Sequence, residues 1–119
     1  MELEVDKKEN YSILKIKGDV DLYSSPQVRK QIIPLASKKN ANLLVNFAEV
    51  TYMDSSGVAT LVEALQLTTR NGGKLRLFNL GQPIKDVFEL SRLDKVFEIY
   101  ENEQQALEGI EKDCAINLD

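Results

Sequence analysis

Residues 43–65, LLVNFAEVTYMDSSGVATLVEAL, decide the fold, because a strand pattern gives way to a helix pattern within them. The run 43–47 is apolar apart from Asn46, which is typical of a central strand covered on both faces. Apolar residues then recur at the i, i+3, i+4, i+7 spacing of an amphipathic helix, at Val58, Leu61, Val62 and Leu65. We therefore predict a strand over 43–47, a loop over 48–53 and a helix that begins close to Ser55.

The N-terminal part of the sequence predicts a β-hairpin. Residues 3–6 and 11–17 are short segments rich in Val, Ile and Leu, and the polar run 7–10 separates them. The second segment mixes apolar and charged residues, which favours a strand that is mostly covered on one face and partly on the other. Gly18 is expected to end this strand.

A helix is expected to follow the second strand. Ser24 and Gln27 have the spacing of a capping box. Ser25 precedes Pro26, which would place a proline at the first helical position, and both signals mark the same start within one residue. Pro34 has no N–H for the helical hydrogen bond, and its ring crowds the carbonyl four residues earlier, so we expect a kink or a break there.

The rest of the chain continues to alternate strands and helices. Asn71 and the two glycines after it predict the end of the second helix. The further elements expected are a strand over 75–78, a helix over 84–90, a strand over 96–100 and a helix over 103–110. The core is expected to include Ile16, Val45, Leu61, Leu65, Leu77, Val87 and Phe97.

The resulting order, β-β-α-β-α-β-α-β-α, predicts an α/β fold. Its sheet would be mixed, with an antiparallel hairpin at the start, later strands joined through helices, and about four helices packed on it. At 119 residues the chain has room for one domain. We expect that domain to occupy residues 1–112, followed by a C-terminal tail over 113–119.

The composition excludes several kinds of catalyst. The sequence contains no histidine, so neither a Ser-His-Asp nor a Cys-His arrangement is possible, and the commonest metal ligand is missing. Cys114 is the only cysteine, so no internal disulfide can form and a reducing compartment is indicated. We therefore expect no catalytic residue, no metal site and no cofactor.

Charge and hydropathy limit the partners and the location. The net charge of −4 and the lack of a basic run argue against direct nucleic-acid binding. All apolar runs are far shorter than the roughly 18 residues that a membrane helix needs, so no membrane insertion is expected. The first residues carry acids where a secretory signal would carry lysines, which indicates a cytoplasmic protein.

A functional site is expected at the junction between the central strand and the second helix. Asp54 and Ser55 lie at this junction, where free backbone N–H groups and the positive end of the helix dipole would face them. A carboxylate or hydroxyl at such a position is commonly the N-cap of the helix. On the four residues Asp-Ser-Ser-Gly alone, the N-cap interpretation is the better one.

The residues around this motif favour a functional role over an N-cap alone. Residues 50–59, VTYMDSSGVA, closely resemble the bacterial anti-sigma factor antagonists of the STAS domain family, whose signature is an apolar residue, Asp, Ser, Ser or Ala, then Gly. The run 18–21 with Ser24 is similar to the family's loop before its first helix, and 72–75 to its turn into the fourth strand. The C-terminal spacing of the family is matched by Val87, Leu90, Leu93 and Phe97. The resemblance spans residues 3–110, and it implies the STAS fold.

The resemblance implies a function by exchange of partners. The unphosphorylated antagonist would bind an anti-sigma factor that is also a serine kinase, and so free a sigma factor. Phosphorylation of Ser55 would end that binding, and a serine phosphatase would reset the protein. The ATP and its magnesium would belong to the kinase. The domain itself is expected to be a monomer or a weak dimer.

The resemblance also assigns the residues of the partner surface. Ser55 directly follows the aspartate and is the expected phosphoacceptor, whereas Ser56 stands where the family accepts Ser or Ala. The expected partner-binding residues are Asp21, Ser24, Asp54, Ser55, Ser56 and Gly57. A phosphate adds about −1.5 to −2 charges, which would repel the partner, while the helix N-terminus would hold it with backbone donors.

Two other functions fit the sequence less well. A response-regulator receiver would need an acidic pair after its first strand and strict β-α alternation, which the opening hairpin contradicts. A serine hydrolase would need a histidine base. The alternative that stays open is a STAS-domain accessory subunit of a lipid-transport ABC system or of a sensory complex.

Overall fold

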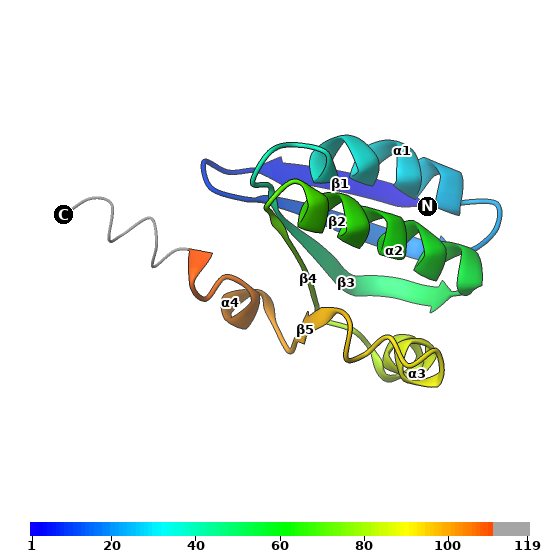
Figure 1. Ribbon diagram of the computed structural model, residues 1–119. Coiled ribbons are helices and arrows are strands. Elements are labelled where there is room, and N and C mark those ends of the chain that lie inside the picture. Colours follow the sequence, from blue (N-terminus) through cyan, green and yellow to red (C-terminus); the bar gives the residue numbers. More distant parts are fainter. Residues whose placement is uncertain (111–119) are drawn as a thin grey trace.

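The computed structural model describes residues 1–110, which form one mixed sheet with helices packed on it (Figure 1). The elements are β1 (Glu2–Lys7), β2 (Ser12–Val20), α1 (Ser25–Ala36), β3 (Asn42–Met53), α2 (Ser55–Arg70), β4 (Lys74–Phe78), α3 (Gln82–Leu90), β5 (Glu98–Tyr100) and α4 (Glu103–Ala106). The strand order is β1-β2-β3-β4-β5; β1 pairs with β2 antiparallel, and the other neighbours are parallel. The predicted α/β class, the hairpin and the element order are confirmed.

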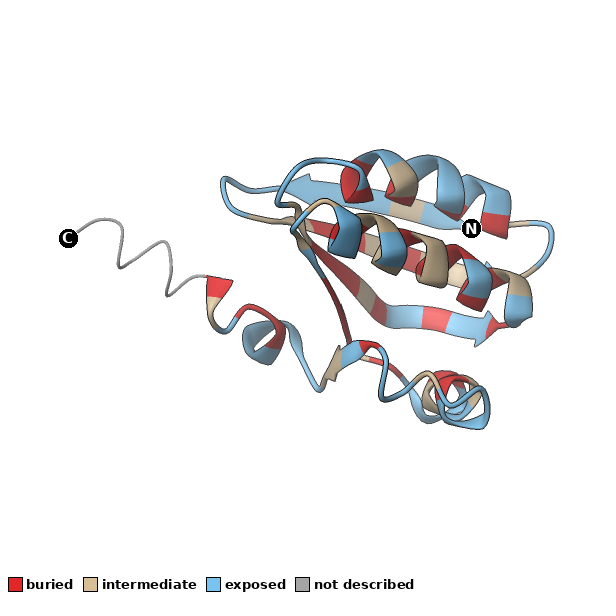
Figure 2. Ribbon diagram, in the orientation of Figure 1, coloured by how far each residue is buried: buried red, intermediate tan, exposed pale blue. Residues whose placement is uncertain are grey.

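The sheet buries side chains on both faces because neighbouring residues of a strand point to opposite sides. Leu14 and Val45 join the main core with α1 and α2, which lie side by side on one face (Figure 1). Ile13 and Leu44 join a smaller cluster with residues of α4 and its C-terminal side. Figure 2 shows the buried residues of α1 and α2 on the sides that face the sheet. The double cover explains why the run 43–47 is almost wholly apolar.

Most of the predicted core is confirmed. Ile16, Val45, Leu61, Leu77 and Phe97 are buried. Leu65 and Val87 are only partly buried, although both pack against the main core. The ring of Phe97 meets that of Phe88 edge to face, with centroids 5.3 Å apart, and so joins the segment after α3 to the helix.

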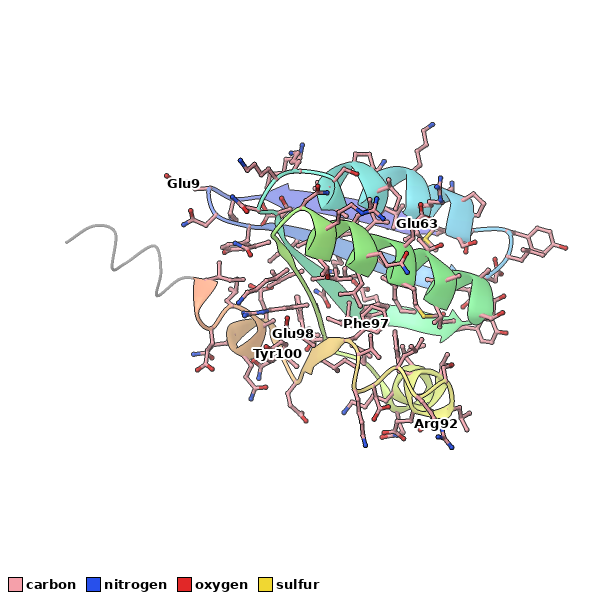
Figure 3. The ribbon with its side chains drawn as sticks, viewed as in Figure 1. Glu9, Glu63, Arg92, Phe97, Glu98 and Tyr100 are labelled. Carbon is pink, nitrogen blue, oxygen red and sulfur yellow. The ribbon has the colours of Figure 1, made fainter. Side chains whose placement is uncertain are left out.

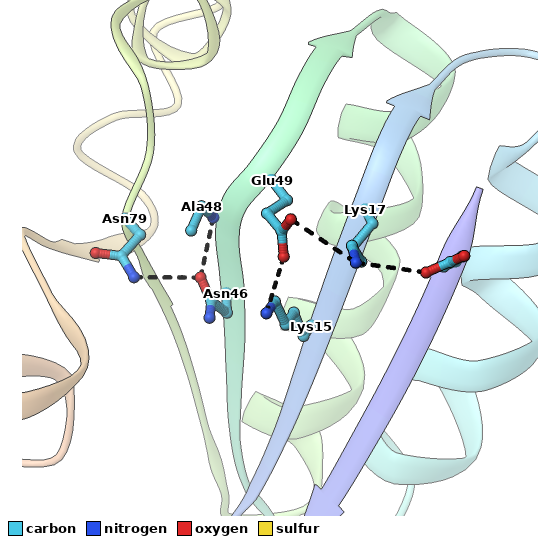
Figure 4. A network of polar contacts seen from close by, with 7 residues as sticks. Lys15, Lys17, Asn46, Ala48, Glu49 and Asn79 are labelled. Carbon is cyan, nitrogen blue, oxygen red and sulfur yellow. Dashed lines mark hydrogen bonds and ion pairs between the residues drawn. The ribbon is translucent and has the colours of Figure 1, made fainter.

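Asn46, the one polar residue of the run 43–47, has a structural role (Figure 4). Its Oδ1 accepts from the Ala48 N–H at 2.9 Å and from Asn79 Nδ2 at 3.2 Å. The same sheet face carries ion pairs from Glu49 to Lys15 at 2.8 Å and to Lys17 at 3.8 Å. Asn46 therefore ties β3 to the segment after β4.

Two strands are longer than predicted. β2 continues past Gly18 to Val20, and β3 continues to Met53, so the loop predicted over 48–53 is wrong. The register shifts between Gly18 and Asp19, which lets Val50 and Met53 both be buried three residues apart. An irregularity of this kind breaks the two-residue period by which a strand is recognised in sequence.

The start of α1 is where the sequence places it, but the details differ. Pro26 lies in the first turn, whereas Ser24 makes no side-chain cap, so the predicted capping box is wrong. The Ser24 hydroxyl instead donates to the Asp19 carbonyl at 2.6 Å. The helix runs through Pro34 to Ala36, so no break occurs there. Lys30, whose carbonyl loses its partner, is exposed, and water can take that hydrogen bond.

The C-terminal elements are shorter than predicted. β5 covers only Glu98–Tyr100, because the N–H groups of Val96 and Phe97 both turn back to the Leu93 carbonyl. α4 covers Glu103–Ala106, although Leu107 and Ile110 are buried. The proposed tail, 113–119, lies outside the described residues. Within 1–110, no helix is long and apolar enough to cross a membrane, and no group of acidic or sulfur side chains could hold a metal ion.

Candidate functional site

The parallel strands β2 and β3 end side by side, and this places two connecting segments together. Val20 pairs with Met53, so the loop after β2 and the start of α2 leave the sheet at the same edge. The Asp54 N–H donates to the Val20 carbonyl at 3.1 Å, and the Leu22 N–H donates to Asp54 Oδ2 at 3.2 Å. The structure therefore brings together the two segments that the sequence analysis assigned to one surface.

Asp54 is the N-cap of α2. Its backbone is extended, and its carboxylate accepts from the N–H groups of Ser56 at 2.9 Å and Gly57 at 3.3 Å. The Ser56 hydroxyl also donates to this carboxylate. The pKa of Asp54 is lowered, chiefly by the Ser56 hydroxyl and further by the N–H groups of Gly57, Ser56 and Leu22, while burial opposes the shift. The carboxylate is thus ionised at neutral pH.

The two serines after Asp54 differ in accessibility. Ser56 is half-buried and its hydroxyl is engaged by Asp54. Ser55 is exposed, and its hydroxyl forms no hydrogen bond to any residue of the described range 1–110. Ser55 therefore presents the accessible hydroxyl of the motif.

The backbone donors at the start of α2 are already in use. The N–H groups of Ser56 and Gly57 point to Asp54, and the Val58 N–H donates to the Asp54 carbonyl at 3.2 Å. The expectation that the helix N-terminus would hold a phosphate on Ser55 stays a prediction; in the unphosphorylated arrangement the Asp54 carboxylate accepts the N–H groups of Ser56 and Gly57. A charge added at Ser55 would lie at the surface, beside a carboxylate.

Gly57 allows α2 to begin against the end of β2. A Cβ atom at this position would lie 2.7 Å from Val20 Cγ1 and 3.0 Å from Met53 Cγ. Such distances are shorter than any ordinary carbon contact, so a side chain would push the helix away from the strands. Glycine at the fourth position of the motif is thereby explained by close packing.

Asp21 and Ser24 shape the loop after β2. Asp21 Oδ1 accepts from the N–H groups of Tyr23 at 2.9 Å and Ser24 at 3.0 Å, and the Asp21 N–H donates to the Ser24 hydroxyl at 2.9 Å. Both side chains are half-buried, and their polar atoms form hydrogen bonds within the loop. They therefore set the conformation that presents Leu22 and Tyr23.

Comparison with known proteins decides the family. The sequence matches the STAS domain family over residues 2–106. This chain belongs to the STAS domain family. The anti-sigma-B factor antagonist of Bacillus subtilis is 32% identical over 101 residues, which cover 83% of this chain and 92% of the relative.

Solved structures support the fold of this STAS domain. An anti-sigma factor antagonist from Mycobacterium paratuberculosis superimposes with a TM-score of 0.81 at 20% identity, covering 92% of this chain and 93% of the other. The Bacillus cell fate determinant SpoIIAA in its phosphorylated form gives a TM-score of 0.67 at 20% identity, covering 89% and 96%. At these identities the likeness establishes the fold.

Exposed apolar side chains surround the site of this STAS domain, and the sequence motifs alone do not predict them. Leu22 is 67% exposed, Tyr23 is 88% exposed and Tyr52, at the end of β3, is 52% exposed. The signal was present, since Leu22 and Tyr23 lie between the two loop-forming residues Asp21 and Ser24. Their exposure became visible only with the loop conformation. Apolar surface of this kind is typical of a protein contact.

Proposed function

We propose that this STAS domain is an anti-sigma factor antagonist controlled by phosphorylation of Ser55. The unphosphorylated form binds an anti-sigma factor that is also a serine kinase, and so frees a sigma factor for transcription. The relatives named anti-sigma factor antagonists support this function, and the exposed Ser55 hydroxyl beside Asp54 is the observation that carries it.

The partner surface combines the loop after β2 with the start of α2. Leu22 and Tyr23 supply apolar contact area, and Asp54 links their loop to the serine through its hydrogen bond from Leu22. Buried apolar and aromatic groups at the centre of an interface supply most of its free energy. Asp21, Ser24, Ser56 and Gly57 support this surface by fixing the backbone around it.

Phosphorylation acts through local charge. A phosphate on Ser55 adds about −1.5 to −2 charges beside the ionised Asp54, on a surface that the partner must desolvate. The N–H groups of Ser56 and Gly57 already bind Asp54, so a phosphate on Ser55 would compete with this carboxylate for them. Repulsion and desolvation then release the partner without unfolding the domain.

The remaining parts of the cycle belong to other proteins. The chain has no histidine, and its role is to bind rather than to catalyse. The anti-sigma kinase supplies ATP, and a serine phosphatase removes the phosphate. The STAS domain acts in the cytoplasm as a monomer or a weak dimer.

The test is to incubate the domain with its anti-sigma kinase and ATP and to map the phosphate by mass spectrometry. Ser55 should be modified in the wild type, Ser55→Ala should take no phosphate and stay bound, and the matched control Ser56→Ala should still be modified at Ser55. Ser55→Asp should bind poorly, with residual affinity because one carboxylate carries less charge than a phosphate. Modification of Ser56 or Thr51 in place of Ser55 would contradict the assignment.

The kinase is to be found by capture from the native cell with unphosphorylated protein. Recovery of a kinase-like anti-sigma factor supports the proposal. Recovery of transporter subunits or of a sensory complex, with no phosphate ever found on these residues, favours the accessory-subunit function.

A further inference from the structure

β1 is an edge strand with one free side. It stands at the end of the sheet order and pairs with β2 alone (Figure 1). Within residues 1–110, no hydrogen bond joins its outer side to another part of the chain. Alternate N–H and C=O groups of such an edge point away from the sheet, where a further strand can pair with them.

The backbone of β1 is regular enough to accept a partner strand. It has six residues and no proline, and its register with β2 is unbroken from Glu2 to Lys7. Soluble proteins usually block an exposed edge with a proline, a bulge, a very short strand or charged side chains. Of these devices β1 has only the charges, so the edge is open to a strand whose own charges fit.

The side of β1 that faces α1 carries apolar residues. Leu3 is half-buried and packs against the main core, whereas Met1 is 40% and Val5 36% exposed. Between β1 and α1 is a groove of about 350 Å³, lined by Met1, Leu3, Gln27, Lys30 and Gln31. A strand added beside β1 would cover this apolar row and the groove.

The other side of β1 carries an acidic row, which consists of Glu2, Glu4 and Asp6. All three are exposed. Lys17 lies 3.5 Å from Glu2, but it is shared with Glu49 of β3, and Lys15 lies 2.8 Å from the same Glu49 (Figure 4). Asp6 has Lys8 at 3.5 Å, and both of these side chains are largely exposed. The acidic row is therefore only partly compensated by the chain's own lysines.

A second copy of the chain does not fit this edge. Antiparallel pairing of two β1 strands, with the faces of the two sheets aligned, would place acids opposite acids. When the pairing is centred on Glu4, for example, Glu2 meets Asp6 of the other copy. Like charges directly opposite each other destabilise a strand pair. The acidic row thus disfavours self-pairing and leaves a cationic strand as the complement.

We propose that β1 binds an extended segment of a partner protein in which apolar residues alternate with lysine or arginine, as a sixth strand of the sheet. The cations of this segment lie beside the acidic row, and its apolar residues extend the row of Met1, Leu3 and Val5. Backbone hydrogen bonds supply affinity in such strand addition, and the alternating side chains supply specificity. Six residues of partner, about 20 Å at 3.3 Å per residue, match the length of β1.

The first test is calorimetric titration of the full chain with a synthetic peptide of three Lys-Val repeats, blocked at both ends. The variant Glu2→Gln/Glu4→Gln/Asp6→Asn should weaken binding at least about tenfold, because three cross-strand charge pairs are lost. The matched control, Glu89→Gln/Asp94→Asn/Glu101→Gln, removes three exposed acids from elsewhere and should change affinity less than about twofold. Melting temperatures check that both variants fold.

The second test examines backbone pairing in the wild-type protein. A Lys-Val peptide methylated on every backbone nitrogen keeps its charges but has no N–H donors, so it should bind at least about tenfold more weakly. Hydrogen exchange at the outer N–H groups of β1 should slow at least about fivefold when the unmethylated peptide is saturating, because those groups are then paired.

Several outcomes would overturn the proposal. They are equal losses in the two triple variants, undiminished affinity of the methylated peptide, or equal binding of a Glu-Val peptide. Exchange in β1 that slows as protein concentration rises, without peptide, would identify a second copy as the occupant instead. Ser55→Asp should leave peptide affinity unchanged, so the result is independent of the proposed switch.

Discussion

Asp54 does two things with one carboxylate. As the N-cap it receives the N–H groups of Ser56 and Gly57, and through its second oxygen it receives Leu22 of the neighbouring loop. Asp54 can therefore be both the N-cap of α2 and a part of the functional site. The cap engages the hydroxyl of the half-buried Ser56 and leaves Ser55 as the accessible serine.

The charge of Asp54 predicts how stability depends on pH. Because its pKa is lowered in the fold, the ionised cap stabilises the domain above the unfolded pKa of about 4, and this is lost as pH falls through the lower folded pKa. Asp54→Asn should therefore melt at a lower temperature than the wild type at pH 7. The difference should shrink when the pH is lowered toward 3, and a difference that stays constant by calorimetry would contradict the role of the charge.

Gly57 predicts a packing effect at a single residue. Gly57→Ala should destabilise the domain by about 1 to 3 kcal/mol, because the added methyl group meets Val20 and Met53 at 3.0 Å or less. Gly81→Ala is the matched control, since its nearest new contact is Pro83 Cδ at 3.8 Å, and it should change stability by no more than about 0.5 kcal/mol. Equal midpoints for both variants in urea unfolding would rule out this packing role.

At the scale of elements, the sequence predicts those helices and strands whose apolar residues recur with a clear period. The start of α2 close to Ser55 and its end at Asn71 are predictable because its apolar spacing, its cap and its terminal glycines agree. The ends of β2 and β3 were missed because the register shift hides the alternation beyond Gly18. The same irregular ends bring the Asp21–Ser24 loop against Asp54. The motif was readable from the sequence, whereas the exposed Leu22 and Tyr23 beside it depend on this tertiary pairing.

The loop after β2 predicts where binding energy lies. Tyr23→Ala should weaken binding to the anti-sigma partner about tenfold or more, because Tyr23 is 88% exposed and follows Leu22, whose N–H donates to Asp54. Leu90→Ala, on α3, removes an apolar side chain that is 86% exposed and should change affinity less than about twofold. Titration calorimetry compares the two, and equal effects would show that the partner does not use this loop.

At the scale of the whole molecule, the two faces of the sheet are closed by different parts of the chain. The carboxyl ends of β2 and β3 lead to the apolar loop and to Ser55. Both faces are closed over β2, β3 and β4, the first by α1 and α2 and the second by the α4 segment. The second closure depends on few contacts, because α4 has only four residues.

Arg76 on β4 is the polar anchor of that closure. It is buried, and its Nη1 donates to the carbonyls of Ala106 at 2.8 Å and Glu108 at 2.7 Å, while its guanidinium lies 5.4 Å from the ring centroid of Tyr100. Its Nε lies 3.4 Å from Glu98 Oε1. Figure 3 shows Glu98 and Tyr100 together on β5, beside α4. One arginine thus joins three elements, and an apolar residue of similar length would keep the packing but leave both carbonyls without a donor.

Arg76→Met should therefore destabilise the domain by about 1 to 3 kcal/mol, the cost of leaving buried acceptors unpaired. The effect should be local as well as global, because Arg76 contacts the α4 segment, whereas its neighbours Leu75 and Leu77 belong to the main core. Hydrogen exchange should quicken first at Ala106, Leu107 and Ile110, whose N–H groups close the last turns. Arg70→Met, an exposed arginine at the end of α2, is the control and should leave that exchange unchanged. If protection were lost evenly across the sheet, or equally in both variants, Arg76 would not be the anchor of the C-terminal segment.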